Sequence, residues 1–148
     1  QALENSSMPK VATADGKGII EVIAGQYEGN EGAASTFTPI HLYNAKIKAG
    51  GSAAFNFPKH YNTALLVIEG SIEINGTDKA NADQMALFYN DGESFEIKAT
   101  EDAVVLILSG EPINEPIAAH GPFVMNTREE IVEAIQDFNM GKFGYLAD

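Results

Sequence analysis

Residues 63–76, TALLVIEGSIEING, decide the fold class of this 148-residue chain. Two short runs of apolar and β-branched residues are separated by Gly70, and the second run ends at Asn75-Gly76. An Asn-Gly pair after such a run is a strong signal for a two-residue hairpin turn. The stretch therefore predicts short antiparallel strands that are joined by tight turns.

Runs of the same kind flank this stretch on both sides. They occupy residues 18–25, 38–50 and 52–57 upstream, and residues 85–89, 94–99 and 103–110 downstream. Turn signals every ~8–12 residues are typical of an antiparallel sandwich or barrel, not of βαβ units. We therefore expect an all-β, jelly-roll-like antiparallel barrel or sandwich over residues 19–126. Residues 1–18 are polar and rich in small residues, so we expect them to form a linker or arm.

Residues 127–148 break this pattern and predict one C-terminal α-helix with a short tail. Thr127 stands three residues before Glu130, which is the capping-box spacing. Apolar residues recur at helical spacing and continue into an aromatic tail, where they are candidates for contact with a partner domain: Ile131, Ile135, Phe138, Phe143 and Tyr145. The alternative is that the tail packs on its own barrel.

The composition excludes several classes of function. Nine basic and 21 acidic side chains give a net charge of −12, which disfavours direct binding to nucleic acid or to an anionic membrane surface. The chain has no cysteine, so disulfides, thiolate catalysis and cysteine-zinc sites are excluded. No apolar run reaches the ~18–20 residues that a membrane span requires.

Apolar side chains of the predicted strands form the expected barrel core. They could instead line a cavity for a small apolar ligand, because small barrels can hold one. The candidate lining residues are Phe55, Phe57, Leu65, Val67, Phe88, Phe95 and Ile97.

Two segments near the C-terminus, GEPINEP at 110–116 and GPFVMNT at 121–127, resemble the C-terminal signature of the pirin family. Upstream, FPKHYNTALLVIEGSIEING at 57–76 is similar to the second cupin motif of that family. The resemblance covers about residues 19–146. It implies a cupin fold and a parent protein with two tandem cupin barrels. It further implies that the N-terminal barrel holds iron through three histidines and one glutamate, and that the C-terminal barrel holds no metal.

The cupin metal pattern can be compared with this chain position by position. It places two histidines one residue apart, a carboxylate four or five residues later, and a glycine about seven residues beyond. Counting back from Gly70 puts the carboxylate position on Thr63. The two histidine positions fall at or next to Asn56 and Pro58, or Phe57 and Lys59. We therefore expect neither a metal nor a catalytic residue in this chain.

The chain has three histidines, His41, His60 and His120, which remain weak candidates for a metal site that only folding would assemble. His60 is out of register with the family pattern by at least one residue. A slip of one residue on a strand turns a side chain to the opposite face, so His60 cannot simply replace a missing ligand.

Three functions stay open on the sequence alone. The chain begins at Gln1, so we expect a fragment: a non-catalytic module that pairs with an absent, iron-binding N-terminal cupin barrel or associates with itself. In the second hypothesis the intact protein is an iron-dependent enzyme resembling the quercetin 2,3-dioxygenases of some bacterial pirins. In the third, the chain is a stand-alone cupin that binds a small ligand or a protein. The resemblance suggests a cytoplasmic location.

Overall fold

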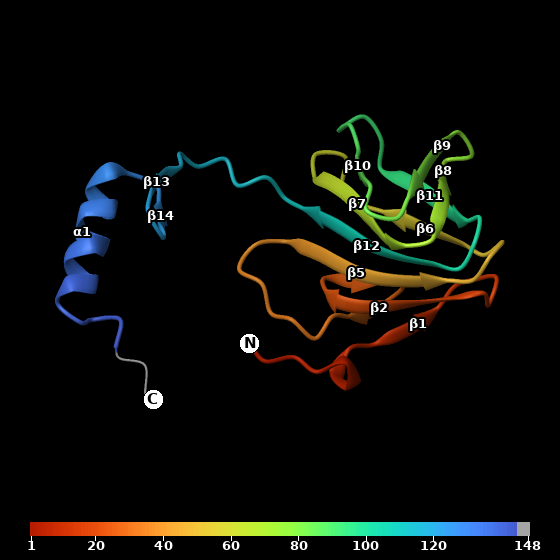
Figure 1. The fold of residues 1–148 in the computed structure, drawn as a ribbon, viewed down its shortest axis with the longest axis horizontal. Coiled ribbons are helices and arrows are strands. Elements are labelled where there is room, and N and C mark those ends of the chain that lie inside the picture. Colours follow the sequence, from red (N-terminus) through yellow and green to blue (C-terminus); the bar gives the residue numbers. More distant parts are fainter. Residues whose placement is uncertain (145–148) are drawn as a thin grey trace. The chain divides into compact units, whose positions relative to one another are not determined.

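The computed structural model describes residues 1–144, and the chain divides into two compact units, Gln1–Pro112 and Ile113–Asp148. The first unit is a β-sandwich, and the second contains the single α-helix of the described residues (Figure 1). The predicted cupin-type antiparallel sandwich with one C-terminal helix is confirmed. None of the helices in residues 1–144 is long and apolar enough to cross a membrane.

Two antiparallel sheets form the sandwich. The larger has six strands in the order β1 (Lys10–Ala12), β2 (Gly18–Ala24), β5 (Ile40–Ile47), β12 (Ala103–Gly110), β7 (Asn62–Glu69) and β10 (Met85–Leu87). The smaller has four strands in the order β6 (Ser52–Asn56), β11 (Ser94–Ala99), β8 (Ser71–Ile74) and β9 (Asp78–Asn81). A 3₁₀ turn (Asn5–Ser7) precedes β1, and β3 (Gln26–Tyr27) pairs with β4 (Asn30–Glu31) in a separate ribbon.

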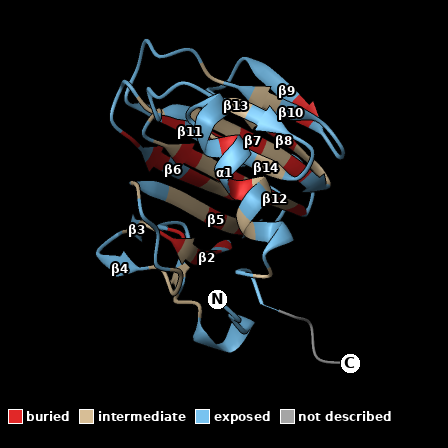
Figure 2. Ribbon diagram, turned by 90° about the vertical axis from the view of Figure 1, so that its left-hand side faces the viewer, coloured by how far each residue is buried: buried red, intermediate tan, exposed pale blue. Residues whose placement is uncertain are grey.

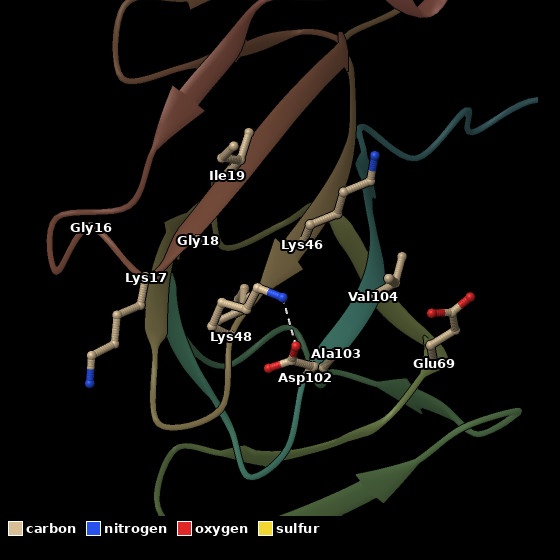
Figure 3. A pocket seen from close by; sticks show the side chains of 11 residues that line it. Gly16, Lys17, Gly18, Ile19, Lys46, Lys48, Glu69, Asp102, Ala103 and Val104 are labelled. Carbon is tan, nitrogen blue, oxygen red and sulfur yellow. Dashed lines mark hydrogen bonds and ion pairs between the residues drawn. The ribbon is translucent and has the colours of Figure 1, made fainter.

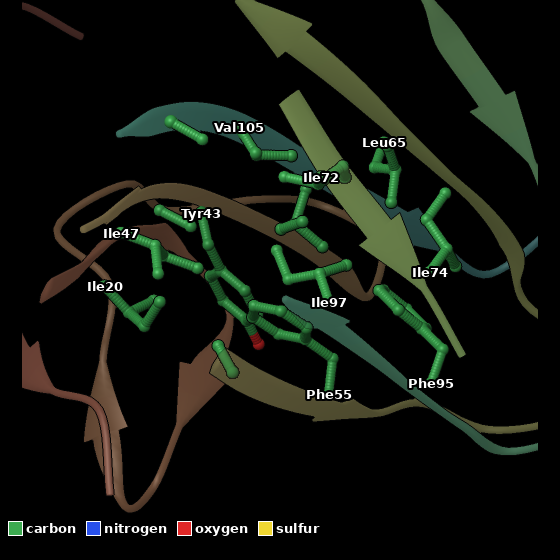
Figure 4. Close-up of a cluster of buried hydrophobic side chains, with 14 of the residues drawn as sticks. Ile20, Tyr43, Ile47, Phe55, Leu65, Ile72, Ile74, Phe95, Ile97 and Val105 are labelled. Atoms are coloured by element: carbon green, nitrogen blue, oxygen red, sulfur yellow. The ribbon is translucent and has the colours of Figure 1, made fainter. Parts of the chain in front are cut away.

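The core lies between the two sheets (Figure 4). Alternate residues of the strands point inward, as the period of two requires, so β12 alternates strictly between buried and partly exposed positions. The largest buried side chains include Tyr43 and Phe55, whose rings lie 6.1 Å apart. Phe55 in turn stacks on Phe95 at 5.3 Å. The barrel is therefore filled by side chains near its middle.

Two turns within residues 63–76 have the backbone conformation that their residues favour. Asn75 and Gly76 both have positive φ, 51° and 70°, as a two-residue hairpin between β8 and β9 requires. Gly70 joins β7 of the larger sheet to β8 of the smaller one, with φ of 76°. A Cβ atom at Gly70 would overlap the carbonyl oxygen of Asp102, so only glycine fits there.

The N-terminal segment differs from the arm expected over residues 1–18. Residues Lys10–Ala12 form the edge strand β1, which pairs with β2. Val11 packs against the core, and Lys10 lies 3.6 Å from the buried carboxylate of Glu21. Backbone pairing with β2, the apolar contact of Val11 and the ion pair of Lys10 place this polar segment on the sheet, although its composition is typical of a linker.

The C-terminal unit consists of the hairpin β13 (Ala118–His120) and β14 (Phe123–Met125), and of helix α1 (Arg128–Asn139). Thr127 Oγ1 accepts a hydrogen bond from the Glu130 amide at 3.2 Å, and a Glu130 carboxylate oxygen accepts one from the Thr127 amide at 2.9 Å. The capping box expected from the sequence is therefore present. The expected barrel extended to residue 126, but the hairpin groups with the helix, in a unit that starts at Ile113.

Candidate functional site

One end of the sandwich, here called the mouth, carries a layer of polar side chains above the apolar core. His41 of β5 lies opposite Ser109 of β12, and Ser109 lies opposite Thr63 of β7. Residues opposite each other on neighbouring strands share one face of the sheet. The same strands place Tyr43, Ile107 and Leu65 in the buried layer below. These polar side chains make the mouth the candidate for a functional site inside the barrel.

His41 is held in one orientation at the mouth. Its Nδ1 atom lies 2.9 Å from the Tyr43 hydroxyl, which donates its own proton to the carbonyl of Gln26 at 2.5 Å. The hydroxyl has a single proton, so His41 Nδ1–H must be the donor to Tyr43. Burial lowers the pKa of His41 below its ordinary value, although the Gln26 carbonyl opposes this, and burial raises the pKa of Tyr43. His41 is therefore a neutral imidazole at pH 7.

Two residues at or next to the positions that the cupin pattern gives to metal ligands, Phe57 and Thr63, make contacts of another kind. Phe57 is 7% exposed, and its ring packs at 5.1 Å from His41 and 6.2 Å from Phe95. Thr63 Oγ1 lies 2.8 Å from Ser109 Oγ, so the two hydroxyls satisfy each other. Neither a phenyl ring nor a threonine hydroxyl paired in this way is a ligand for iron. The residues of the mouth do not fit an iron centre.

The three histidines are not brought together. The rings of His41 and His60 flank Tyr61, at 6.0 and 4.9 Å from its ring, but His60 is exposed and lies 3.7 Å from Glu111. His120 ends β13 in the other compact unit. Within residues 1–144 no group of three or more His, Cys, Asp or Glu side chains is arranged to hold a metal ion.

The proposed cavity-lining residues mostly pack as core. Phe55, Phe57, Leu65, Val67, Phe95 and Ile97 belong to the buried cluster, and Phe88 packs against it. Phe57, Phe88 and Phe95 also line a cavity of about 90 Å³ beside the mouth. Pockets for drug-sized molecules enclose roughly 300–1,000 Å³. This cavity is too small for a molecule with three fused or linked rings.

A larger hollow of about 430 Å³ lies at the opposite end of the six-stranded sheet (Figure 3). Two of the three lysines around it are paired with carboxylates: Lys48 Nζ lies 2.7 Å from Asp102, and Lys46 Nζ donates to Glu21 at 2.9 Å. The remaining lining is largely backbone and aliphatic carbon, with no nucleophile beside an acid or base. The hollow has the chemistry of a salt-bridged surface, not that of a reaction centre.

The outer surface of the six-stranded sheet carries an apolar area that spans four neighbouring strands, bordered on β5 by Asn44, which lies opposite Leu106. Leu106 of β12 lies opposite Leu66 of β7, and Leu66 lies opposite Met85 of β10. We define the sheet face as the side chains that share this surface: Leu42, Ala64, Leu66, Met85, Leu87, Leu106 and Leu108. Met85 is 58% exposed and Leu87 75% exposed.

A signal for the sheet face was present in the sequence. The runs ALLVI at 64–68 and VVLIL at 104–108 are continuously apolar instead of alternating. Such runs are typical of strands that are covered on both faces. Only Leu65 and Val67 of these two runs were expected as core or cavity-lining residues, and no second apolar face was predicted, because the length of an apolar run does not say what covers its second face.

The C-terminal unit presents a second apolar surface. Ile131 is nearly buried between α1 and the hairpin, whereas Ile135 is partly exposed and lines a groove of about 590 Å³. Phe138 and Phe143 are 61% and 62% exposed, and their rings form a cluster with Phe123. Tyr145, the remaining candidate contact residue, lies outside the described residues. Figure 2 shows α1 buried at only a few positions.

Known proteins resemble this chain over almost its whole length. It is 39% identical over 143 residues to a candidate quercetin 2,3-dioxygenase of Pseudomonas aeruginosa, covering 97% of this chain and 50% of the relative. Human pirin is 32% identical over 150 residues, covering 98% of this chain and 51% of pirin. The crystal structure of a quercetin 2,3-dioxygenase from Acinetobacter baumannii matches with a TM-score of 0.89 and 39% identity, over 99% of this chain and 51% of that chain.

The chain thus spans about half the length of the curated relatives it matches. The family model of the pirin C-terminal cupin domain matches residues 42–144. This chain therefore belongs to the pirin family, as its C-terminal cupin domain.

Proposed function

We propose that this chain is a metal-free structural module that pairs with a second, iron-binding cupin barrel. The observation that carries the proposal is the mouth of the barrel, where Thr63 stands at the carboxylate position of the cupin pattern and Phe57 at one of the alternatives for a histidine position. A closed aromatic core lies below them. The apolar sheet face and the exposed apolar C-terminal unit support a docking role, because large exposed apolar patches mark interaction sites.

The intact protein is, in this proposal, an enzyme of the quercetin 2,3-dioxygenase type. Relatives with that description are about twice as long as this chain. Iron in the other barrel would supply open coordination positions for substrate oxygens and O₂. This chain would hold that barrel and wall one side of its cleft. A cytoplasmic location belongs to the same proposal, on the likeness to bacterial members of the family.

Metal analysis of the isolated chain tests the metal-free role. After incubation with Fe²⁺ or Ni²⁺ and gel filtration, we expect no stoichiometric metal in the wild-type chain. The His41→Phe and His60→Phe variants serve as matched controls and should be indistinguishable from it. One metal ion per chain that disappears in either variant would overturn the proposal, because the barrel would then have its own centre.

Quercetin consumption and oxygen uptake by the intact protein test the enzymatic part. We expect iron-dependent turnover in the intact protein and none in this chain with added iron. His41→Phe in the intact protein should keep its iron content, since His41 faces Tyr43 and Phe57 of its own barrel. An iron-loaded intact protein that does not consume quercetin would remove the proposed activity, while the pairing role would still stand.

A further inference from the structure

Glycine follows an aspartate or asparagine at three places in the chain: Asp15-Gly16, Asn75-Gly76 and Asp91-Gly92. At such a pair the glycine amide nitrogen can attack the side-chain carbonyl carbon of the preceding residue, because glycine has no Cβ atom to shield it. The product is a five-membered succinimide ring, which water opens to aspartate or isoaspartate. By chemistry alone Asn75 is the most reactive of the three, since a neutral amide accepts a nucleophile more readily than a carboxylate does.

The Asp15-Gly16 pair is held by hydrogen bonds on both of its reacting groups. The Asp15 carboxylate accepts from the Thr13 hydroxyl at 2.6 Å and from the amides of Lys17 and Ser52, each at 2.9 Å. These bonds lower the pKa of Asp15 to about 2, so its side chain is a carboxylate at neutral pH. The Gly16 amide donates to the Thr13 carbonyl at 2.9 Å. Ring closure at this pair would have to break all of these bonds.

The Asn75-Gly76 pair is held by its side chain. The main-chain amide of Asn75 donates to the Glu96 carbonyl at 2.9 Å, and Asn75 Oδ1 accepts from the Glu96 amide at 3.0 Å. The side chain thus continues the pairing of β8 with β11. The succinimide ring would join the Asn75 side chain to the Gly76 nitrogen, so it can form only when that side chain leaves Glu96. The folded hairpin therefore protects the pair that is most reactive by chemistry alone.

The Asp91-Gly92 pair lies in the loop between β10 and β11 and is held by neither kind of contact. Asp91 is exposed, and its carboxylate has no hydrogen-bond or ion-pair partner within residues 1–144. The chain turns at Asn90 and Asp91, but no hydrogen bond of good geometry from the Gly92 amide closes this turn in the described chain. A Cβ atom at Gly92 would meet nothing within 4 Å, so there is open space beside the amide.

Both ends of this loop are fixed, so its freedom is concentrated at the pair. Asn90 Nδ2 donates to the Tyr61 carbonyl at 3.0 Å, and the Phe57 amide donates to the Glu93 carbonyl at 2.8 Å. Asp91 and Gly92 lie between these two anchors. Local opening costs least where backbone hydrogen bonds and buried contacts are few. The pair can therefore change conformation while the rest of the sandwich stays folded.

We infer that Asp91-Gly92 is the site at which this protein forms isoaspartate. The Gly92 nitrogen bonds to Asp91 Cγ, and the amide proton and the carboxyl hydroxyl leave as one water molecule. A second water molecule then adds to the main-chain carbonyl carbon of Asp91 and breaks the bond from that carbon to the Gly92 nitrogen. The chain now runs through Cγ, and the former main-chain carbonyl is the free carboxylate. One water is released and one is taken up, so no further reactant is needed.

The modification alters the rim of the mouth. Asp91 and Gly92 line the cavity of about 90 Å³ together with Phe57 and Phe88. Isoaspartate lengthens the main chain by one carbon and attaches the carboxylate directly to Cα. The loop therefore changes its course and the position of its charge, although mass and net charge stay the same.

Peptide mapping of the folded 148-residue chain, aged at neutral pH, tests the inference. Electron-transfer fragmentation distinguishes isoaspartate from aspartate, and labelling by an isoaspartate methyltransferase confirms the assignment. Isoaspartate should form at least about tenfold faster at Asp91 than at Asp15, which has the same chemistry but is held by hydrogen bonds. Gly92→Ala should slow it at least about tenfold, because the new Cβ shields the amide. That Cβ has open space, so the variant should fold as wild type does.

Equal rates at Asp15 and Asp91 would overturn the inference, and so would an unchanged rate in Gly92→Ala. The Asp91→Asn variant supplies the sharper comparison, because it places two pairs of identical chemistry in one chain. Each deamidation adds about 1 Da to its peptide. In the folded variant, position 91 should deamidate at least about tenfold faster than Asn75, and in urea the two rates should converge.

Faster deamidation at Asn75 than at position 91 of the folded variant would show that the contacts with Glu96 do not protect the hairpin, and the inference would fall. Circular dichroism establishes that Asp91→Asn is folded before the rates are compared. None of these outcomes bears on the proposed function, which is decided by the metal content and quercetin turnover of the intact protein.

Discussion

His41 and Tyr43 lie on one face of β5 and are joined by a hydrogen bond of 2.9 Å between Nδ1 and the phenolic oxygen. The Tyr43 hydroxyl in turn donates a hydrogen bond to the Gln26 carbonyl. Gly25 stands beside the imidazole so closely that a Cβ atom there would meet His41 Nδ1 at 2.5 Å. The polar layer at the mouth is therefore anchored to the strand that follows β2.

Removing the Tyr43 hydroxyl tests this anchor. Tyr43→Phe should lower the free energy of unfolding by about 1–2 kcal/mol, because a half-buried imidazole N–H loses its partner. Urea denaturation measures the change, with Tyr89→Phe as control, since Tyr89 is 87% exposed and should behave as wild type. Equal stability of Tyr43→Phe and wild type would show that water replaces the hydroxyl without cost.

Two glycines with the same backbone conformation should differ in their tolerance of alanine. Gly70 and Gly76 have φ of 76° and 70°, so both substitutions strain the backbone by about 1 kcal/mol. At Gly70 the new Cβ also overlaps the carbonyl of Asp102, whereas at Gly76 it meets only a carboxylate oxygen of Glu73 at an ordinary contact distance of 4.0 Å. Gly70→Ala should therefore lower the melting temperature considerably more than Gly76→Ala. Similar melting temperatures for the two variants would mean that the β7–β8 turn can shift.

Glu21 should make stability depend on acid pH. Burial alone raises the pKa of this carboxyl, but hydrogen bonds from Lys46, Asn44 and Asn5 outweigh it and lower the pKa from 4.5 to about 2. A folded-state pKa below the unfolded value stabilises the fold above pH 4.5, and the stabilisation is lost as the pH falls from 4.5 towards 2.

Replacement of Glu21 by glutamine measures this contribution. Glu21→Gln should lower the free energy of unfolding by on the order of 1–3 kcal/mol at pH 7, and the difference from wild type should shrink at pH 3. Denaturant titrations at both pH values give the comparison. Glu101→Gln is the control at an exposed position and should show neither effect. A constant difference at the two pH values would exclude the ionised carboxylate as the cause.

The capping box of α1 should decide how firmly the C-terminal unit is folded. Thr127→Ala removes the side-chain acceptor for the Glu130 amide and should cost about 1 kcal/mol of helix stability. Hydrogen exchange of the α1 amides should accelerate, while exchange in the sandwich should not change. Thr127→Ser keeps the hydroxyl and should match wild type. Faster exchange in β5 and β12 as well would instead indicate that the C-terminal unit and the sandwich unfold together.

Much of the fold could be predicted because its signals are local. The runs of residues 18–25, 94–99 and 103–110 became β2, β11 and β12 with only small shifts of their ends. The Asn75-Gly76 turn and the Thr127–Glu130 box formed as expected, since each depends on backbone preferences and on contacts within a few residues. Three of the four strands that have three residues, β1, β13 and β14, were missed, because they are too short to show a period of two, whereas β10 lies within the predicted run 85–89.

The candidate site was less accessible to prediction. The position count put the carboxylate position on Thr63 and left two alternatives for the histidine positions, but nothing in it indicated that Thr63 would pair with Ser109, 46 residues away. The assignment of His41 to a neutral, Nδ1-protonated form depends on Tyr43 and on the carbonyl of Gln26. Burial and the direction of hydrogen bonds arise only when distant strands meet.

By itself the sequence determined the strand and helix pattern, the antiparallel cupin sandwich and the absence of a metal-ligand pattern at residues 56–63. These follow from side-chain periodicity and turn chemistry, which act over a few residues. Only the tertiary structure decided that Leu66, Met85 and Leu106 share one outer surface, and that residues 113–144 group apart from the sandwich. Strand register decides which apolar residues lie side by side, and register is set by long-range pairing across the whole sheet.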